Sequence, residues 1–98
     1  MDESQIPVKE PLRGACEVLG LDPLYVANEG RFVLFVPATE CDKALPILHK
    51  HSVSAAATDI GEVLKTPAPH SPPVTLRTVI GTHRILDLLS GEQLPRIC

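Results

Sequence analysis

The expected fold is decided by one stretch, Leu24-Tyr25-Val26-Ala27-Asn28-Glu29-Gly30-Arg31-Phe32-Val33-Leu34-Phe35-Val36. Its two halves, residues 24–27 and 31–36, are rich in β-branched and aromatic residues, which favour strands. Between them, Asn and Gly tolerate a positive φ, so the stretch predicts a β-hairpin. The second half is apolar almost throughout, which is typical of a central strand covered on both faces.

A helix is predicted before this hairpin. Its apolar residues recur at a spacing that places them on one helical face, with Pro11 tolerated in the first turn. Gly20 supplies a left-handed stop, and Asp22-Pro23 prevents the helix from continuing. The residues of the apolar face are Val8, Leu12, Ala15, Cys16 and Leu19.

A second helix is predicted after the hairpin. Residues 39–42 (Thr-Glu-Cys-Asp) resemble a capping box in which Asp42 replaces the usual Glu or Gln. Pro46 interrupts the helix, so that it either kinks there or begins its regular part near Pro46. The buried stripe would consist of Cys41, Ala44, Leu45 and Leu48.

The remaining sequence predicts two further strands. Residues 55–64 fit a helix or a strand, and residues 66–73 form a proline-rich loop. Residues 74–80 alternate as in a half-buried strand, Gly81-Thr82 bends the chain, and residues 83–90 suit a strand or a short helix. Arg77, Arg84 and Asp87 could form ion pairs across these strands, although exposed pairs of this kind contribute little stability.

The order of elements is therefore α-β-β-α-β-β followed by an arm. We expect an α+β fold, with a mostly antiparallel sheet covered by two helices and a flexible C-terminal tail. Residues 1–7 form a polar lead-in, residues 8–90 a partial α+β domain, and residues 91–98 the tail.

Composition excludes several classes of function. The net charge is −3, and the chain has only three aromatic residues and no basic stripe, which argues against nucleic acid. No stretch approaches the roughly 20 apolar residues that a membrane span needs. The N-terminus has no apolar signal region, and the three cysteines form no disulfide framework. We expect reduced thiols and a cytoplasmic protein.

Candidate internal sites are weak. His49 and His51 lack a further ligand at a familiar spacing, so we expect no metal site there. They are better explained as cations that are favourable near the C-terminus of a helix. Cys16 and Cys41 lie at apolar stripe positions, which favours core packing over a nucleophilic role. The sequence contains neither a glycine-rich phosphate loop nor a P-loop, so this chain alone should bind no cofactor.

The tail ends Gly91-Glu92-Gln93-Leu94-Pro95-Arg96-Ile97-Cys98, with a thiol on the last residue. Pro95 stiffens the arm, and the Arg96 cation favours the nucleophilic thiolate. Chain ends are usually disordered, however, so the tail chemistry alone favours a terminus without a role over a reactive thiol. The carboxylate of Glu29 is likewise most simply a solvated group at a turn.

Three stretches together resemble one family, the hydrogenase-maturation carbamoyl dehydratases (HypE). They are residues 13–30 (Arg-Gly-Ala-Cys-Glu-Val-Leu-Gly-Leu-Asp-Pro-Leu-Tyr-Val-Ala-Asn-Glu-Gly), residues 59–63 (Asp-Ile-Gly-Glu-Val) and the tail with its Pro-Arg-Ile-Cys ending. The resemblance runs from about residue 6 to the end, in the order of the family. It implies the C-terminal domain fold of aminoimidazole ribonucleotide synthetase.

The resemblance implies a chemistry for the tail. In this family a partner carbamoyltransferase loads a carbamoyl group onto the terminal cysteine, here Cys98, with Pro95, Arg96 and Ile97 positioning the tail. ATP then activates the carbamoyl oxygen, and dehydration leaves a thiocyanate whose cyano group becomes a cyanide ligand of iron on a scaffold complex of the [NiFe]-hydrogenase pathway. Glu29 matches the family's Asn-Glu-Gly motif and is the candidate base.

The resemblance also implies missing parts. The ATP-binding domain of the family and the opening of its C-terminal domain are absent, so whether this chain is an enzyme by itself is open, and inactivity alone is expected. The absent half of the enzyme is an expected partner, and exposed edges predict a homo-oligomer. The alternative is a non-catalytic module that binds hydrogenase-maturation partners; a redox or metal-binding thiol protein is a more distant one.

Overall fold

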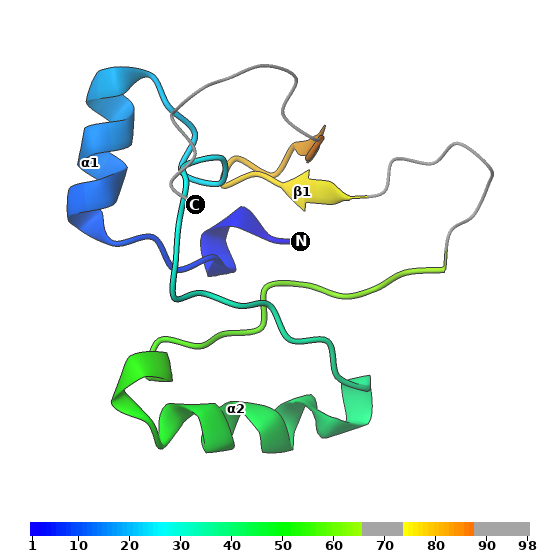
Figure 1. The fold of residues 1–98 in the computed structure, drawn as a ribbon. Helices are drawn as coiled ribbons and strands as arrows, with labels where there is room; N and C mark the ends of the chain where they lie inside the picture. Colours follow the sequence, from blue (N-terminus) through cyan, green and yellow to red (C-terminus); the bar gives the residue numbers. More distant parts are fainter. Residues whose placement is uncertain (66–73, 88–98) are drawn as a thin grey trace. The chain divides into compact units, whose positions relative to one another are not determined.

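The structure is a computed structural model that describes residues 1–65 and 74–87. The predicted proline-rich loop and the predicted tail therefore lie outside the described residues. The chain divides into two units, which we describe separately. The first unit contains Met1–Pro7 and Val36–Asp87, and the described part of the second unit is residues 8–35 (Figure 1).

The second unit contains the first predicted helix, α1, which spans Glu10–Leu19. Pro11 lies in its first turn, where a missing N–H costs no intrahelical bond. Gly20 ends α1 in the left-handed conformation (φ 66°), as predicted. The predicted apolar face is confirmed in part. Cys16 is buried and Val8 and Leu12 are half-buried, whereas Ala15 and Leu19 are exposed.

The predicted hairpin is wrong. Residues 23–25 form a turn, and residues 31–36 lie in no strand. The carboxylate of Asp22 accepts a hydrogen bond from the Leu24 N–H (2.9 Å), and its carbonyl accepts one from the Tyr25 N–H (3.0 Å). These bonds hold the backbone in a turn that local β propensity does not overcome.

The first unit contains the second predicted helix, α2, which spans Cys41–His49. A 3-10 helix at Ala38–Glu40 leads directly into it, and Glu40 at the N-cap makes no side-chain capping bond, so the predicted capping box is wrong. The helix runs through Pro46. Because Pro46 has no N–H, the Asp42 carbonyl four residues earlier lacks its intrahelical donor.

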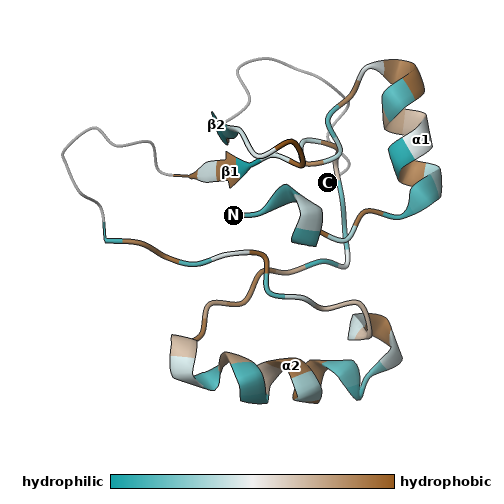
Figure 2. Ribbon diagram, turned by 180° about the vertical axis from the view of Figure 1, so that it is seen from behind, coloured by the Kyte–Doolittle hydropathy of each residue, from teal (hydrophilic) through white to brown (hydrophobic). Residues whose placement is uncertain are grey.

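The predicted stripe of α2 is confirmed as its more buried side. Its four residues are half-buried, while the neighbouring helical residues are exposed, and Figure 2 shows the mixture of apolar and polar residues along α2. After the 3-10 helix Ser52–Ser54 the chain returns along α2. The Ser54 hydroxyl donates to the Leu48 carbonyl (2.6 Å), and Nε2 of His49 lies 2.7 Å from the Ala57 carbonyl.

The sheet of the first unit is a hairpin of β1 (Thr75–Arg77) and β2 (His83–Ile85). The strands are antiparallel, with Leu76 opposite Arg84, and the Leu76 side chain is fully buried. Gly81 (φ 84°) lies in the turn between them, as predicted. Asp2 forms a parallel bridge with Arg77 on the other side of β1, so the N-terminus lies beside the sheet (Figure 1).

The α+β class, with two helices and antiparallel pairing, is confirmed. The predicted strand at residues 74–80 is shorter than expected, because its second half forms the turn. Residues 83–90 begin as a strand, one of the two predicted possibilities. None of the helices in the described residues is long and apolar enough to cross a membrane.

Candidate functional site

The candidate base Glu29 lies in an exposed irregular segment of the second unit. Asn28, Glu29 and Gly30 are all exposed, and Gly30 has the positive φ (71°) that the sequence suggested, although no hairpin turn forms there. The Glu29 carboxylate makes no hydrogen bond with any residue in the described part of the chain. It is therefore available to a group that approaches from solvent.

The candidate carrier Cys98 and its positioning residues Pro95, Arg96 and Ile97 lie outside the described residues. The structure thus places one member of the predicted site, Glu29, and leaves its distance from the tail untested. The roles of these five residues remain predictions.

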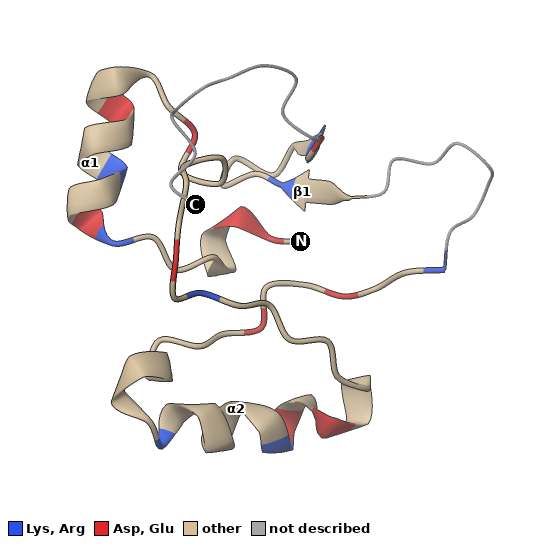
Figure 3. Cartoon of the chain, viewed as in Figure 1, with Lys and Arg blue, Asp and Glu red and all other residues tan. Residues whose placement is uncertain are grey.

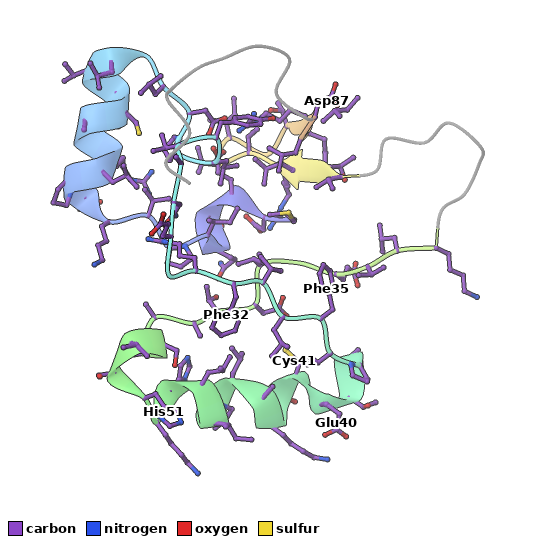
Figure 4. All side chains as sticks on the ribbon, viewed as in Figure 1. Phe32, Phe35, Glu40, Cys41, His51 and Asp87 are labelled. Carbon is purple, nitrogen blue, oxygen red and sulfur yellow. The ribbon has the colours of Figure 1, made fainter. Side chains whose placement is uncertain are left out.

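The matched stretch at residues 59–63 forms the centre of a hydrogen-bonded cluster in the first unit. One carboxylate oxygen of Asp59 accepts from the Gly61 N–H (2.9 Å), and the other lies 3.7 Å from Sγ of Cys41, which can donate to it. Figure 4 shows Cys41 at the start of α2. Asp59 thereby joins the beginning of α2 to the segment that returns from its end.

This cluster keeps the Cys41 thiol protonated. Burial raises the pKa of Cys41 above its ordinary value, and the negative charge of Asp59, with the hydrogen bond to it, raises the pKa further. A thiol with a raised pKa is a weak nucleophile. Cys41 is therefore a packing and hydrogen-bonding residue, and Cys16 is buried in the second unit.

The N-terminal residues of the first unit are clamped between the matched stretch and β1. The Asp2 N–H donates to the Ile60 carbonyl (2.9 Å), and the Arg77 N–H donates to the Met1 carbonyl (2.9 Å). Gly61 lies so close to Met1 that a Cβ built on it would be 2.7 Å from the Met1 Cα. Only glycine fits at residue 61 without a displacement of this segment.

Arg77 also forms an ion pair with Asp2, and Figure 3 shows the acidic start of the chain beside the basic end of β1. Hydrogen bonds from Arg77 and then from Ser4 lower the pKa of Asp2 from 3.8 to about 2. Sequence reasoning missed this pair because it considered Asp87 as the partner. Asp2 lies 75 positions away from Arg77, and no local pattern signals such a contact.

No group of three or more metal-ligating side chains occurs in residues 1–65 and 74–87. His49 uses Nε2 for the Ala57 carbonyl, and since a carbonyl only accepts, this nitrogen carries the proton. Nε2 of His49 is thus occupied by a structural hydrogen bond.

Comparison with known proteins identifies the family. Residues 1–70 match the model of the AIR synthase related protein, C-terminal domain. The chain is 46% identical over 98 residues to the carbamoyl dehydratase HypE of Rhodobacter capsulatus. This match covers 100% of the chain but only 28% of the Rhodobacter protein. The match lies in the C-terminal part of such relatives.

Solved structures agree with this. A structure of the hydrogenase maturation protein HypE in complex with ATP matches 99% of this chain with a TM-score of 0.86 and 39% identity, and the match covers 29% of that chain. HypE in a HypE–HypF complex matches 88% of this chain with a TM-score of 0.75 and 41% identity, over 27% of that chain. The predicted resemblance is confirmed: this chain belongs to the AIR synthase related protein C-terminal domain family and is homologous to the C-terminal part of HypE.

Proposed function

We propose that this chain is the carrier portion of a carbamoyl dehydratase of [NiFe]-hydrogenase maturation, with Cys98 as the carrier thiol. The observation that supports this most strongly is the alignment of the whole chain with a HypE carbamoyl dehydratase at 46% identity. The chain spans 28% of that relative, so the activity of the whole protein belongs to the proposal.

The carrier chemistry has three steps. The Cys98 thiolate attacks a carbamoyl donor and forms an S–C(=O)NH₂ thiocarbamate, with loss of the thiol proton and of the donor's leaving group. The carbamoyl oxygen and both nitrogen-bound protons then leave as the elements of water, which yields S–C≡N. Transfer of the cyano group as cyanide to iron breaks the S–C bond, takes two electrons from the iron-carrying scaffold complex and a proton from solvent, and so restores the thiol.

Glu29 is the proposed base for the nitrogen-bound protons. Its carboxylate is exposed and makes no hydrogen bond with any described residue, so it can accept a proton from a group delivered by the tail. Pro95, Arg96 and Ile97 would direct the thiol to it. The geometry of that encounter belongs to the proposal.

ATP would not bind to this chain alone. HypE has been solved with ATP, which fits an ATP-dependent activation of the oxygen in the longer protein. This sequence has no glycine-rich phosphate loop, so the residues that hold ATP belong to the part of the family polypeptide beyond this match. The proposed cellular place is the cytoplasm, where reduced thiols persist.

The partner carbamoyltransferase supplies the test. The complex of HypE with HypF supports such a partner for the longer protein. The folded chain, incubated with the carbamoyltransferase, carbamoyl phosphate and ATP, should gain one carbamoyl group, which peptide mass spectrometry should locate on Cys98. Cys98→Ser should abolish the adduct, and Cys41→Ser, which removes the protonated thiol, should retain it. An unmodified chain beside a fully modified full-length relative would refute the proposal.

A second candidate function is a non-catalytic module that binds the same maturation partners. It is favoured by the short span of this chain against its relatives, together with the match of 88% of the chain to HypE in its HypF complex. Cys98→Ala separates the two: a module keeps its affinity for the carbamoyltransferase in this variant and gains no carbamoyl group in the wild type.

A further inference from the structure

The sheet of the first unit has one covered edge and one open edge. On the β1 side, the Met1 ammonium donates to the Thr75 carbonyl (2.8 Å), and the Arg77 N–H donates to the Met1 carbonyl (2.9 Å). On the β2 side, no further strand of the described residues pairs with the sheet. Because Figure 2 shows β2 beside β1 and nothing described pairs beyond it, β2 is the edge strand.

The ladder shows which backbone groups of β2 face the open edge. The Leu86 N–H donates to the Val74 carbonyl (3.0 Å), and hydrogen-bonded pairs alternate with non-bonded pairs along an antiparallel ladder. Arg84, two residues before Leu86, therefore bonds to β1, whereas His83 and Ile85 direct their N–H and C=O groups outward. Neither His83 nor Ile85 has a further hydrogen-bond partner among residues 1–65 and 74–87.

An open edge of this kind can accept a strand from another polypeptide. Main-chain hydrogen bonds then provide affinity, and alternate side chains provide specificity. The Ile85 side chain is 56% exposed, and Arg84 is half-buried. A fitting partner strand therefore has an apolar residue beside Ile85 and a carboxylate opposite Arg84, because opposite charges across a strand pair attract each other.

A second copy of this chain fits the edge less well. In the antiparallel register that pairs all three residues of β2 in both copies, the two Arg84 side chains would lie directly opposite each other. Like charges in that position are destabilising. The charge on β2 thus favours a different protein over self-association.

The position of β2 in the chain indicates which protein this is. β2 ends at Ile85, and the proposed carrier thiol belongs to Cys98. Residues 86–98 span at most about 43 Å, at about 3.3 Å per residue. A protein bound to β2 therefore keeps its own active site within reach of the thiol, and such tethering gives an effective concentration on the order of millimolar. The enzyme that needs this access is the one that loads the thiol.

We propose that the open edge of β2 is the docking edge for the partner carbamoyltransferase, which adds one strand to the sheet there. The added strand bonds to the outward N–H and C=O groups of His83 and Ile85 and places a carboxylate opposite Arg84. The identity of the partner rests on the proposed carrier function. The docking contacts themselves require no chemistry at Cys98.

Binding of the carbamoyltransferase to two variants at Ile85 tests the proposal. Ile85→Pro removes an outward N–H without removing a bond to β1, and proline is tolerated on an edge strand in that position. Ile85→Val is the matched control, because it keeps the N–H and a branched apolar side chain. By titration calorimetry, Ile85→Pro should bind about tenfold or more weakly, because a carbonyl of the partner loses its donor, and Ile85→Val should bind like wild type.

Hydrogen exchange of the wild type needs no substitution. The amides of His83 and Ile85 should exchange rapidly in the free chain and slowly in the complex with the carbamoyltransferase. The Arg84 amide, which bonds to β1 in both states, should change less. Unchanged exchange of His83 and Ile85 in the complex would overturn the proposal. So would equal affinity of Ile85→Pro and Ile85→Val, or a wild-type dimer that Ile85→Pro converts to a monomer.

Two separate measurements distinguish a failure of docking from a failure of the carrier function. Docking is measured with Cys98→Ala, which keeps β2 intact, and the carbamoyl adduct is measured with the wild type. Retained docking of Cys98→Ala, with slow exchange at His83 and Ile85, supports the docking edge even where no adduct forms on the wild type. An adduct on Cys98 without protection of β2 would support the carrier thiol and refute the docking edge.

Discussion

Replacing Gly61 by alanine should release the N-terminal residues from the first unit. The new Cβ would lie 2.7 Å from the Met1 Cα, a backbone atom that cannot move away alone. Displacement of Met1 and Asp2 would break three hydrogen bonds, from the Asp2 N–H to the Ile60 carbonyl, from the Arg77 N–H to the Met1 carbonyl and from the Met1 ammonium to the Thr75 carbonyl. Each contributes about 0.5–1.5 kcal/mol, so the displacement alone should lower the free energy of unfolding by about 1.5–4.5 kcal/mol.

Backbone strain at residue 61 adds to this loss of stability, and a substitution at Gly81 measures such strain separately. Gly61 has φ 147° and Gly81 has φ 84°, both unfavourable for alanine, but nothing lies within 4 Å of a Cβ at Gly81. Strain of this kind costs about 1–3 kcal/mol. Gly81→Ala should therefore show the strain alone, and Gly61→Ala should destabilise by about 1.5–4.5 kcal/mol more, which is the contribution of the three broken bonds.

Urea unfolding of both variants measures the difference, since the unfolding free energy falls linearly with denaturant. Gly14→Ala is a control of opposite sign. Gly14 lies within α1 with no atom near its Cβ position, so alanine should stabilise by about 0.5–1 kcal/mol. If Gly61→Ala lost no more stability than Gly81→Ala, the close approach of Met1 to Gly61 would be refuted.

Three further changes probe other contacts. Because its pKa is lowered to about 2, the ionised Asp2 stabilises the fold fully above pH 3.8, and this stabilisation is lost as the pH falls through about 2. Arg77→Gln removes the ion pair, so its stability should be slightly below that of wild type above pH 3.8. This small difference should vanish as the pH falls through about 2 in acid-unfolding curves. Because burial and Asp59 raise the pKa of Cys41, Asp59→Asn should speed its alkylation by iodoacetamide at neutral pH; an unchanged rate would contradict the contact. Pro46→Ala restores a backbone N–H donor inside α2 and should raise the free energy of unfolding by up to about 3 kcal/mol, which a higher melting temperature would show. A lower melting temperature would count against the continuous α2.

Both helices could be predicted because their determinants are local. The apolar spacing of α1, the proline in its first turn and the left-handed Gly20 lie within a few residues of one another. The start of α2 was harder, since its predicted capping bond competes with a 3-10 helix that leads straight into Cys41. Local signals therefore specify that a helix exists more reliably than how it begins.

The absence of the predicted hairpin and the contact of the N-terminal residues with β1 could not be predicted, because a strand depends on partners elsewhere in the chain. Residues 31–36 have the composition of a central strand, and that composition reports burial without saying which polypeptide provides it. The bridge between Asp2 and Arg77 joins residues 75 positions apart, and its partners carry no shared motif. Ladder contacts depend on the whole topology, so single-sequence patterns miss them.

The two internal stretches that resemble HypE differ in whether structural contacts account for their residues. Asp59 accepts hydrogen bonds from the Cys41 thiol and the Gly61 N–H, and Gly61 leaves space for Met1, so structure alone accounts for these residues. Glu29 is exposed and makes no hydrogen bond with any described residue, so no described contact requires a carboxylate there. Glu17 and Glu62 are exposed in the same way, so the proposed role of Glu29 as the base depends on its Asn-Glu-Gly motif. Glu29→Gln should accordingly leave both stability and Cys98 carbamoylation unchanged and should abolish dehydration when the chain is completed by the rest of a HypE-type polypeptide. Loss of stability in this variant would instead assign Glu29 to the fold.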